Sequence, residues 1–193
     1  MNVLFDPNTH TYTVDGIRLP SVTEITRFLS FDYKSDKPWL AQIAAQRGTA
    51  VHEACMLIDY GEEPEETPET SGYLKAYRRF LADYQPEWEL IEHPMGSIDL
   101  GYAGSLDRMG HMCGNRVLLD IKTGSTLHHS AIQAQLGGYW WLLLDQEGKS
   151  VEALYALRLD KSGIYELVQE PNGDHLFDAC MILHKATERK KRR

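Results

Sequence analysis

Three short segments with the composition of β-strands follow one another in the middle of the chain, and they constrain the fold more than any other feature. They are residues 88–92, 100–108 and 116–122. Gly114 lies in the gap between the last two and suits a hairpin turn. A helical pattern over 130–144 and a further strand over 151–159 follow. This order predicts an α/β (α+β) domain in which helices flank a central mixed β-sheet.

Further elements are expected on both sides of this block. Residues 11–14 and 17–19 alternate around an Asp-Gly turn signal, which predicts a β-hairpin. Ser21 stands three residues before Glu24, the spacing of a capping box at the start of a helix. The other expected elements are helices over 22–30, from a cap at Ser35 or Asp36 to about 60, over 73–84 and over 174–190, and a strand over 164–168.

Length and charge limit the organisation of the chain and its partners. The 193 residues fit one domain over 1–193, with the hairpin and first helix in 1–34 and a basic tail in 185–193. The formal net charge is −8, but the last nine residues hold six Lys or Arg and one Glu. An acidic total does not by itself exclude a nucleic acid as a partner, because a site for hard metal ions concentrates carboxylates. The negative charge indicates that any contact with DNA is local and does not extend over the whole surface.

Cellular location and cofactor class follow from features that the sequence lacks. No apolar run reaches the roughly 18 residues of a membrane span. The first residues have neither the basic nor the apolar region of a signal peptide. We therefore expect a cytoplasmic protein with no membrane partner. The three cysteines, Cys55, Cys113 and Cys180, form no CxxC pair, which argues against an iron–sulfur cluster.

Two acids and a lysine in the predicted strands are the main candidates for chemistry. Asp107 lies near the end of one strand and Asp120 near the end of the next. If these strands pair, both carboxylates reach one edge of the sheet, and alternation places Lys122 on the same face as Asp120. Ile121 then points into the core and leaves its backbone carbonyl at that edge. On its own, the Asp-x-Lys pattern is more typical of a residue pair on a solvated strand face than of a catalytic site.

Phosphodiester hydrolysis uses groups of these kinds. Carboxylate and carbonyl oxygens suit Mg²⁺ or Mn²⁺, and an ammonium group beside the metal offsets charge in the transition state. His52, on the helix before the sheet, can add a nitrogen ligand. Gln135 and Tyr139 are four residues apart on the helix after the sheet and so share a face.

Taken in order, these residues resemble the motifs of RecB-like and lambda-exonuclease-like nucleases of the PD-(D/E)xK superfamily, over about residues 47–160. The motifs are Arg47-Gly48-xxx-His52, Gly104-Ser105-Leu106-Asp107, Asp120-Ile121-Lys122-Thr123-Gly124 and Gln135-xxx-Tyr139. The resemblance implies a restriction-endonuclease-like core and one or two Mg²⁺ or Mn²⁺ ions. The cysteines that hold an iron–sulfur cluster in several such nucleases have no counterpart here.

The resemblance also implies a role for each residue. His52, Asp107, Asp120 and the carbonyl of Ile121 would bind metal, and Lys122 would be the catalytic lysine. Gln135 and Tyr139 would steady the substrate or the edge of the site. Arg47 would contact a phosphate or brace its helix.

The resulting hypothesis is a metal-dependent DNA nuclease, and by family analogy a phage-type exonuclease of DNA recombination or repair. It would act in the cytoplasm of a bacterial or phage-infected host cell. A single-strand annealing or other recombination protein, or further copies of the chain, would be its protein partners. Two alternatives stay open: a catalytically inactive DNA-binding or scaffolding module of the same fold, and a structure-specific endonuclease.

Overall fold

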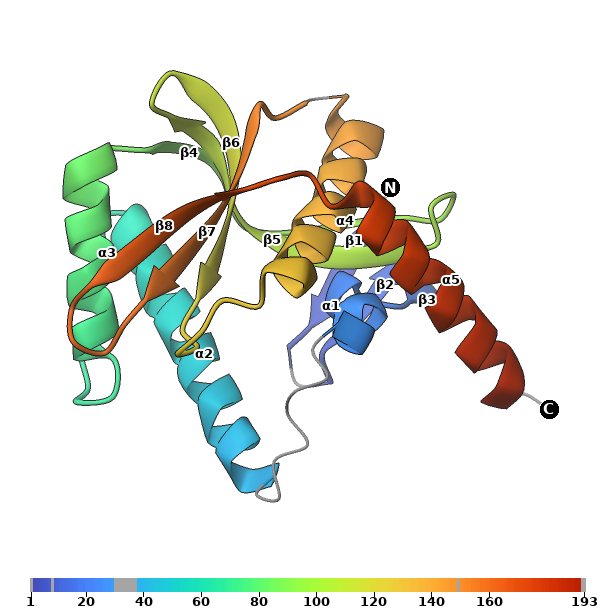
Figure 1. Ribbon diagram of the computed structural model, residues 1–193, viewed down its shortest axis with the longest axis horizontal. Helices are drawn as coiled ribbons and strands as arrows, with labels where there is room; N and C mark the ends of the chain where they lie inside the picture. Colours follow the sequence, from blue (N-terminus) through green and yellow to red (C-terminus); the bar gives the residue numbers. More distant parts are fainter. Residues whose placement is uncertain (1, 8, 30–37, 149, 192–193) are drawn as a thin grey trace.

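A mixed sheet of five strands forms the centre of the computed structural model, which describes residues 2–7, 9–29, 38–148 and 150–191 (Figure 1). The strands lie side by side in chain order, and only β6 and β7 pair in parallel. They are β4 (Glu87–Ser97), β5 (Tyr102–Met112), β6 (Asn115–Lys122), β7 (Ala153–Leu159) and β8 (Tyr165–Glu170). The predicted α/β (α+β) class with a central mixed sheet is confirmed, and the arrangement is consistent with a restriction-endonuclease-like core.

Helices cover both faces of this sheet (Figure 1). Helix α4 (His129–Glu147) connects β6 to β7, because parallel neighbours need a crossover connection. It shares one apolar core with α1 (Val22–Thr26) and α5 (Asp174–Lys191). Helices α2 (Pro38–Asp59) and α3 (Ser71–Tyr84) form the second core on the other face.

Strand β6 separates the two cores by simple alternation. Leu118 packs in the core under α4, whereas Leu119 and Ile121 pack in the core under α2 and α3. Because successive strand side chains point to opposite faces, Asp120 and Lys122 fall on the α4 face. The strand thus ends with two charged residues on the α4 face and, between them in sequence, the apolar Ile121 on the opposite face.

A second, three-stranded sheet precedes the central one, in the order β1 (Val3–Asp6), β2 (Thr11–Val14) and β3 (Ile17–Leu19). The predicted hairpin is β2 with β3, whereas β1 was not predicted. The cap at Ser21 is confirmed: its Oγ accepts a hydrogen bond from the backbone N–H of Glu24 at 3.0 Å. Ser21 also pairs with Ala103 of β5 in a β-bridge, which joins this unit to the central sheet.

Some boundaries differ from those that the sequence indicated. Strand β4 continues through Pro94 to Ser97, although the pattern predicted an end at residue 92. A strand at the edge of a sheet tolerates proline because only one of its sides has to pair. The caps proposed at Ser35 and Asp36 lie outside the described residues.

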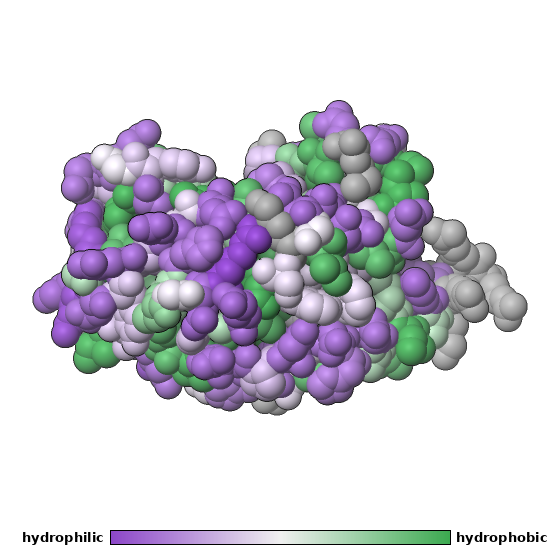
Figure 2. Space-filling view, turned by 90° about the horizontal axis from the view of Figure 1, so that it is seen from above, coloured by the Kyte–Doolittle hydropathy of each residue, from purple (hydrophilic) through white to green (hydrophobic). Residues whose placement is uncertain are grey.

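In the described part of the chain, no helix is both long enough and apolar enough to cross a bilayer. Figure 2 shows one face of the molecule, on which hydrophilic side chains predominate and apolar ones appear in separate groups.

Candidate metal centre

The site lies at the point where strands β5 and β6 diverge, which we call the fork. Their last register pair at this end is Arg108 with Leu119, and Asp107 and Asp120 follow directly on the two strands. Beyond the fork, the backbone of Ile121 no longer pairs with β5. Its N–H donates instead to Asp107 Oδ2 at 2.6 Å, and its carbonyl oxygen lies 3.1 Å from Nε2 of His52. The fork therefore brings the two predicted acids and the backbone carbonyl of Ile121 together.

Three side chains from three elements converge beside this fork. His52 of α2, Glu92 of β4 and Asp107 of β5 each offer one ligand atom, and these atoms lie within 4.8 Å of one another. His52 Nδ1 is 3.2 Å from Glu92 Oε1 and 3.7 Å from Asp107 Oδ1. Two carboxylates and an imidazole, with the Ile121 carbonyl adjacent, form a donor set that fits Mg²⁺ or Mn²⁺.

Glu92 was not among the residues that the sequence motifs singled out for this site. It lies inside β4, between the register pairs Ile91–Arg108 and His93–Leu106, and so opposite Asp107. Its φ angle of 45° is in the left-handed region, which a residue other than glycine adopts at a cost of about 1–2 kcal/mol. Surrounding contacts must stabilise this conformation. A left-handed residue inside a strand does not alter the sequence pattern of apolar and polar residues. The sequence therefore showed that residue 92 is acidic, but not that it would lie opposite Asp107.

Arg108 supplies those contacts from beneath the cluster. Its side chain is fully buried, and its Nη1 donates to Glu92 Oε1 at 2.8 Å and to the Asp107 carbonyl at 2.7 Å. Its Nε donates to Asp59 Oδ2 at 2.6 Å. The hydroxyl of Tyr77 also donates to Asp59. One buried cation therefore holds Glu92 in place and compensates two acids.

Lys122 forms a second charged group on the α4 side of the fork. Its ammonium lies 2.6 Å from Asp120 Oδ2 and donates to Gln135 Oε1 at 3.1 Å. Burial acts to lower the pKa of Lys122, but the negative charges of Asp120 and Asp107 outweigh it and raise the pKa. Lys122 thus remains protonated and supplies positive charge to the cavity.

Burial and neighbouring charges also shift the pKa values of Asp107 and His52. Burial raises the pKa of Asp107 to about 7, with the carboxylates of Asp120 and Glu92 adding to the effect and His52 opposing it. Burial disfavours a charged His52, but Asp107 and Glu92 outweigh that effect and raise its pKa to about 9. In the absence of a bound cation, the imidazolium of His52 is the positive partner of these acids.

These groups line a cavity of about 450 Å³. Its lining includes the candidates His52, Asp107, Asp120, Lys122, Gln135 and Tyr139, together with Glu92. Tyr139 fills the space above Gly104, where an added Cβ would lie 2.8 Å from Tyr139 Cε1. The N-terminal sheet forms another wall, since Phe5 and Tyr12 line the cavity and the Tyr12 hydroxyl donates to Ser105 Oγ at 3.0 Å.

Of the predicted site residues, two do not line this cavity: Ile121, which was predicted for its backbone carbonyl, and Arg47. Its Nη2 lies 3.5 Å from the carbonyl oxygen of Thr123, and its guanidinium stands over the ring of Tyr73 at 5.6 Å. These contacts connect α2 to α3 and to the end of β6. Of the two roles considered for Arg47, they match bracing of its helix.

Comparisons with known proteins give little further information. No family model matches the chain, and no curated protein matches it. A solved structure of LHK-Exo in complex with dAMP resembles it over 90% of this chain and 92% of that one. The sequence identity is 14% and the TM-score is 0.34, a value too low to establish a shared fold. The local geometry is therefore the main basis for a functional proposal.

Proposed function

We propose that this chain is a single-domain, metal-dependent nuclease that hydrolyses phosphodiester bonds in DNA, with Mg²⁺ or Mn²⁺ as cofactor. The observation that carries the proposal is the convergence of His52, Glu92 and Asp107 within 4.8 Å, in a cavity that also contains Lys122. Carboxylates that face one another without solvent repel strongly, and a divalent cation relieves that repulsion.

In this proposal His52, Glu92, Asp107 and the Ile121 carbonyl hold the metal ion. Once bound, the ion would neutralise charge on the phosphate and lower the pKa of a water molecule. The Asp120 carboxylate lies against Lys122, and this contact makes it the group that orients the lysine and a candidate ligand for a second ion. Compared with the predicted ligands, this set has Glu92 in the place of Asp120, which lies outside the group of His52, Glu92 and Asp107.

The remaining residues act through position and charge. Lys122 keeps its proton and places an ammonium beside the phosphate, where negative charge builds up during hydrolysis. Gln135 fixes the direction of that ammonium through the 3.1 Å hydrogen bond. Tyr139 shapes the cavity wall, and burial raises the pKa of its hydroxyl, so that it stays neutral. Arg108 is a positioning residue that acts through Glu92.

The cellular role extends this proposal by analogy alone. The motif resemblance favours an exonuclease of DNA recombination or repair in a phage or bacterial setting, in the cytoplasm. A recombination protein and further copies of the chain are its expected partners.

The test is cleavage of linear and circular DNA with Mg²⁺, with Mn²⁺ and with EDTA. Loss of linear DNA that requires metal and that disappears in Lys122→Met supports the proposal; Arg18→Met, at an exposed cation on β3, is the matched control. Cleavage that persists in EDTA overturns it. DNA binding without cleavage of any substrate would indicate the inactive module, and cleavage of circular DNA would indicate an endonuclease.

A further inference from the structure

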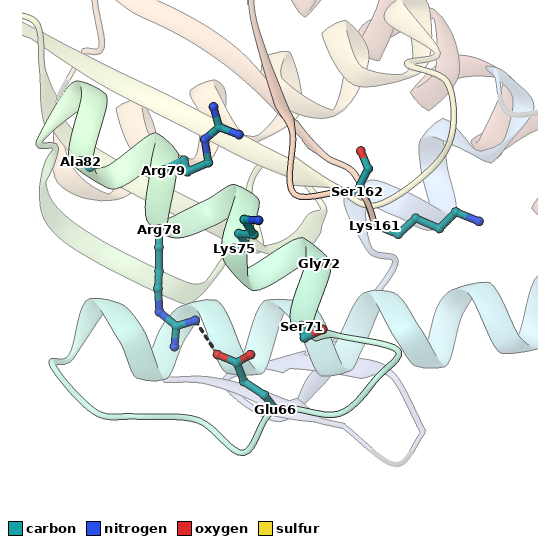
Figure 3. Close-up of a pocket in the computed structure, with 9 residues that line it drawn as sticks. All are labelled: Glu66, Ser71, Gly72, Lys75, Arg78, Arg79, Ala82, Lys161 and Ser162. Atoms are coloured by element: carbon teal, nitrogen blue, oxygen red, sulfur yellow. Dashed lines mark hydrogen bonds and ion pairs between the residues drawn. The ribbon is translucent and has the colours of Figure 1, made fainter.

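A second hollow lies away from the candidate metal centre and is rich in cations (Figure 3). It has a volume of about 660 Å³. One wall is α3, the other is the turn between β7 and β8, and the loop before α3 closes one end. The lining residues are Glu66, Ser71, Gly72, Lys75, Arg78, Arg79, Ala82, Lys161 and Ser162. Four of these nine are Lys or Arg and one is acidic, in a chain whose net charge is −8.

One of the four cations is already neutralised. Arg78 pairs with Glu66 and, at 3.0 Å, with Glu63. Among the described residues, the ammonium groups of Lys75 and Lys161 have no ion pair, and both side chains are exposed. Arg79 uses one N–H to donate to the Gly163 carbonyl at 3.2 Å and keeps its other donors. Three cations therefore remain available to an anionic ligand.

The groove is held in shape by contacts between its two walls. At Gly72 an added Cβ would lie 1.8 Å from the carbonyl oxygen of Lys161, so the start of α3 and the turn touch directly. The aliphatic stem of Lys75 lies against Gly163, whose φ is +83°. Backbone contacts fix the two walls relative to each other, so the backbone positions that carry Lys75, Arg79 and Lys161 are set before any ligand binds.

The groove and the candidate metal centre lie at the same end of the sheet. Strands β6 and β7 run parallel and pair Lys122 with Arg158, and Lys161 follows in the turn after β7. One strand spacing and the reach of three residues limit the separation of Lys122 and Lys161 to about 15 Å. At about 3.4 Å per nucleotide along a strand of B-form DNA, this corresponds to roughly four nucleotides at most.

We propose that the groove formed by Lys75, Arg79 and Lys161 binds the phosphates of a nucleic acid strand whose cleaved bond lies in the metal centre. This inference rests on the proposed function and adds a second contact region to it. Phosphate oxygens accept hydrogen bonds from ammonium and guanidinium groups. The groove has no aromatic residue in its lining for base stacking, so the contact is with the backbone and is independent of sequence.

The experiment compares Lys75→Met/Lys161→Met with the wild type on two substrates, a single-stranded 20-mer and a dinucleotide. Methionine keeps the aliphatic stems and removes the charges. For the 20-mer we expect KM to rise on the order of tenfold with kcat unchanged. The slope of log affinity against log salt should fall by roughly 1.4, or 0.7 per lost phosphate contact. The dinucleotide has a single phosphodiester, which occupies the cleavage site and leaves no phosphate for the groove, so its cleavage should not change.

Arg18→Met is again the control for loss of an exposed cation, and it should leave both substrates unaffected. If KM and the salt slope for the 20-mer are unchanged in the double variant, the proposal that the groove binds phosphates is wrong. An equal loss on both substrates also overturns it, because it would place the effect at the cleavage site.

Failure of the proposed function gives a different result. If the wild type cleaves neither substrate with Mg²⁺ or Mn²⁺, binding of a fluorescent 20-mer in EDTA still tests the groove by anisotropy. Binding by the wild type that is weakened on the order of tenfold in the double variant supports it. Equal binding by the two proteins, or no binding by either, overturns it. Competition by inorganic phosphate as strong as that by the 20-mer would indicate a site for a single anion and also overturn it.

Discussion

The guanidinium of Arg108 donates a hydrogen bond of 2.8 Å to the Glu92 carboxylate, and this contact connects the buried interior to the candidate metal centre. On its other side Arg108 binds Asp59 at 2.6 Å, and both of these side chains are almost completely inaccessible to solvent. A buried cation with these partners stabilises an acid in a strained backbone conformation. The site therefore depends on residues that line no part of the cavity.

Arg108→Ala should lower the free energy of unfolding by about 3–5 kcal/mol, because it leaves the buried Asp59 without its cation. Urea denaturation measures this loss. The control is Arg78→Ala, which breaks ion pairs of a half-exposed side chain and should cost less than about 1 kcal/mol. Equal losses for the two variants would show that the buried network is no more important than a surface pair.

Glu92→Gln should weaken Mg²⁺ or Mn²⁺ binding at least about tenfold while the protein stays folded, since it removes one charged ligand. Isothermal titration calorimetry measures the affinity. Glu89→Gln on the same strand is the matched control, because Glu89 pairs with Arg116 at 2.7 Å instead. Affinity that is unchanged in Glu92→Gln would remove this residue from the ligand set.

Metal affinity should rise as the pH increases from 6 to 9. Asp107, with a pKa of about 7, and His52, with a pKa of about 9, must both lose a proton to bind a cation. The same shifts act on the fold. Both pKa values are raised above their unfolded values, so protonation stabilises the folded state and this contribution is lost as the pH rises through them.

Thermal unfolding with and without Mg²⁺ at pH 6, 7, 8 and 9 checks this pH dependence. The increase in Tm caused by the metal should grow across the series, while the Tm without metal should fall. The opposite trend, or a constant difference, would contradict the assigned titration of these two groups.

Gly104→Ala should reduce DNA cleavage and destabilise the fold by about 1–3 kcal/mol, because the added methyl group overlaps Tyr139 and Val22. Gly124→Ala is the control, since its Cβ would meet its nearest neighbour at 3.5 Å, an ordinary contact. Activity and Tm measured on both variants provide the comparison. Full activity in Gly104→Ala would mean that the position of Tyr139 does not matter.

Much of the fold follows from local patterns, and part of the site does not. Alternation along 116–122 predicted both the burial of Ile121 and the common face of Asp120 and Lys122. Glu92 depends on the β4–β5 register and on one left-handed residue, which are long-range and conformational features. In the sequence, Arg108 looks like an ordinary cation of a strand. Its role depends on Asp59 of α2 and Tyr77 of α3, which only the tertiary structure places beside it.

Strand β1 shows the same limit on a smaller scale. Its four residues, Val-Leu-Phe-Asp, do not alternate between apolar and polar, and they become a strand because β2 pairs with them. The phosphate groove likewise arises from the approach of Gly72 to Lys161, two positions far apart in the sequence. Local sequence patterns therefore predict most helices and strands, whereas the two candidate sites depend on contacts between elements that are far apart in the sequence.

The most direct test of the metal centre is a crystal structure of the protein soaked in Mn²⁺, with the ion located by its anomalous signal. We expect an ion within about 2.0–2.6 Å of His52, Glu92, Asp107 and the carbonyl oxygen of Ile121. An anomalous peak elsewhere, or no peak at millimolar Mn²⁺ in a crystal whose cavity is open to solvent, would contradict the account.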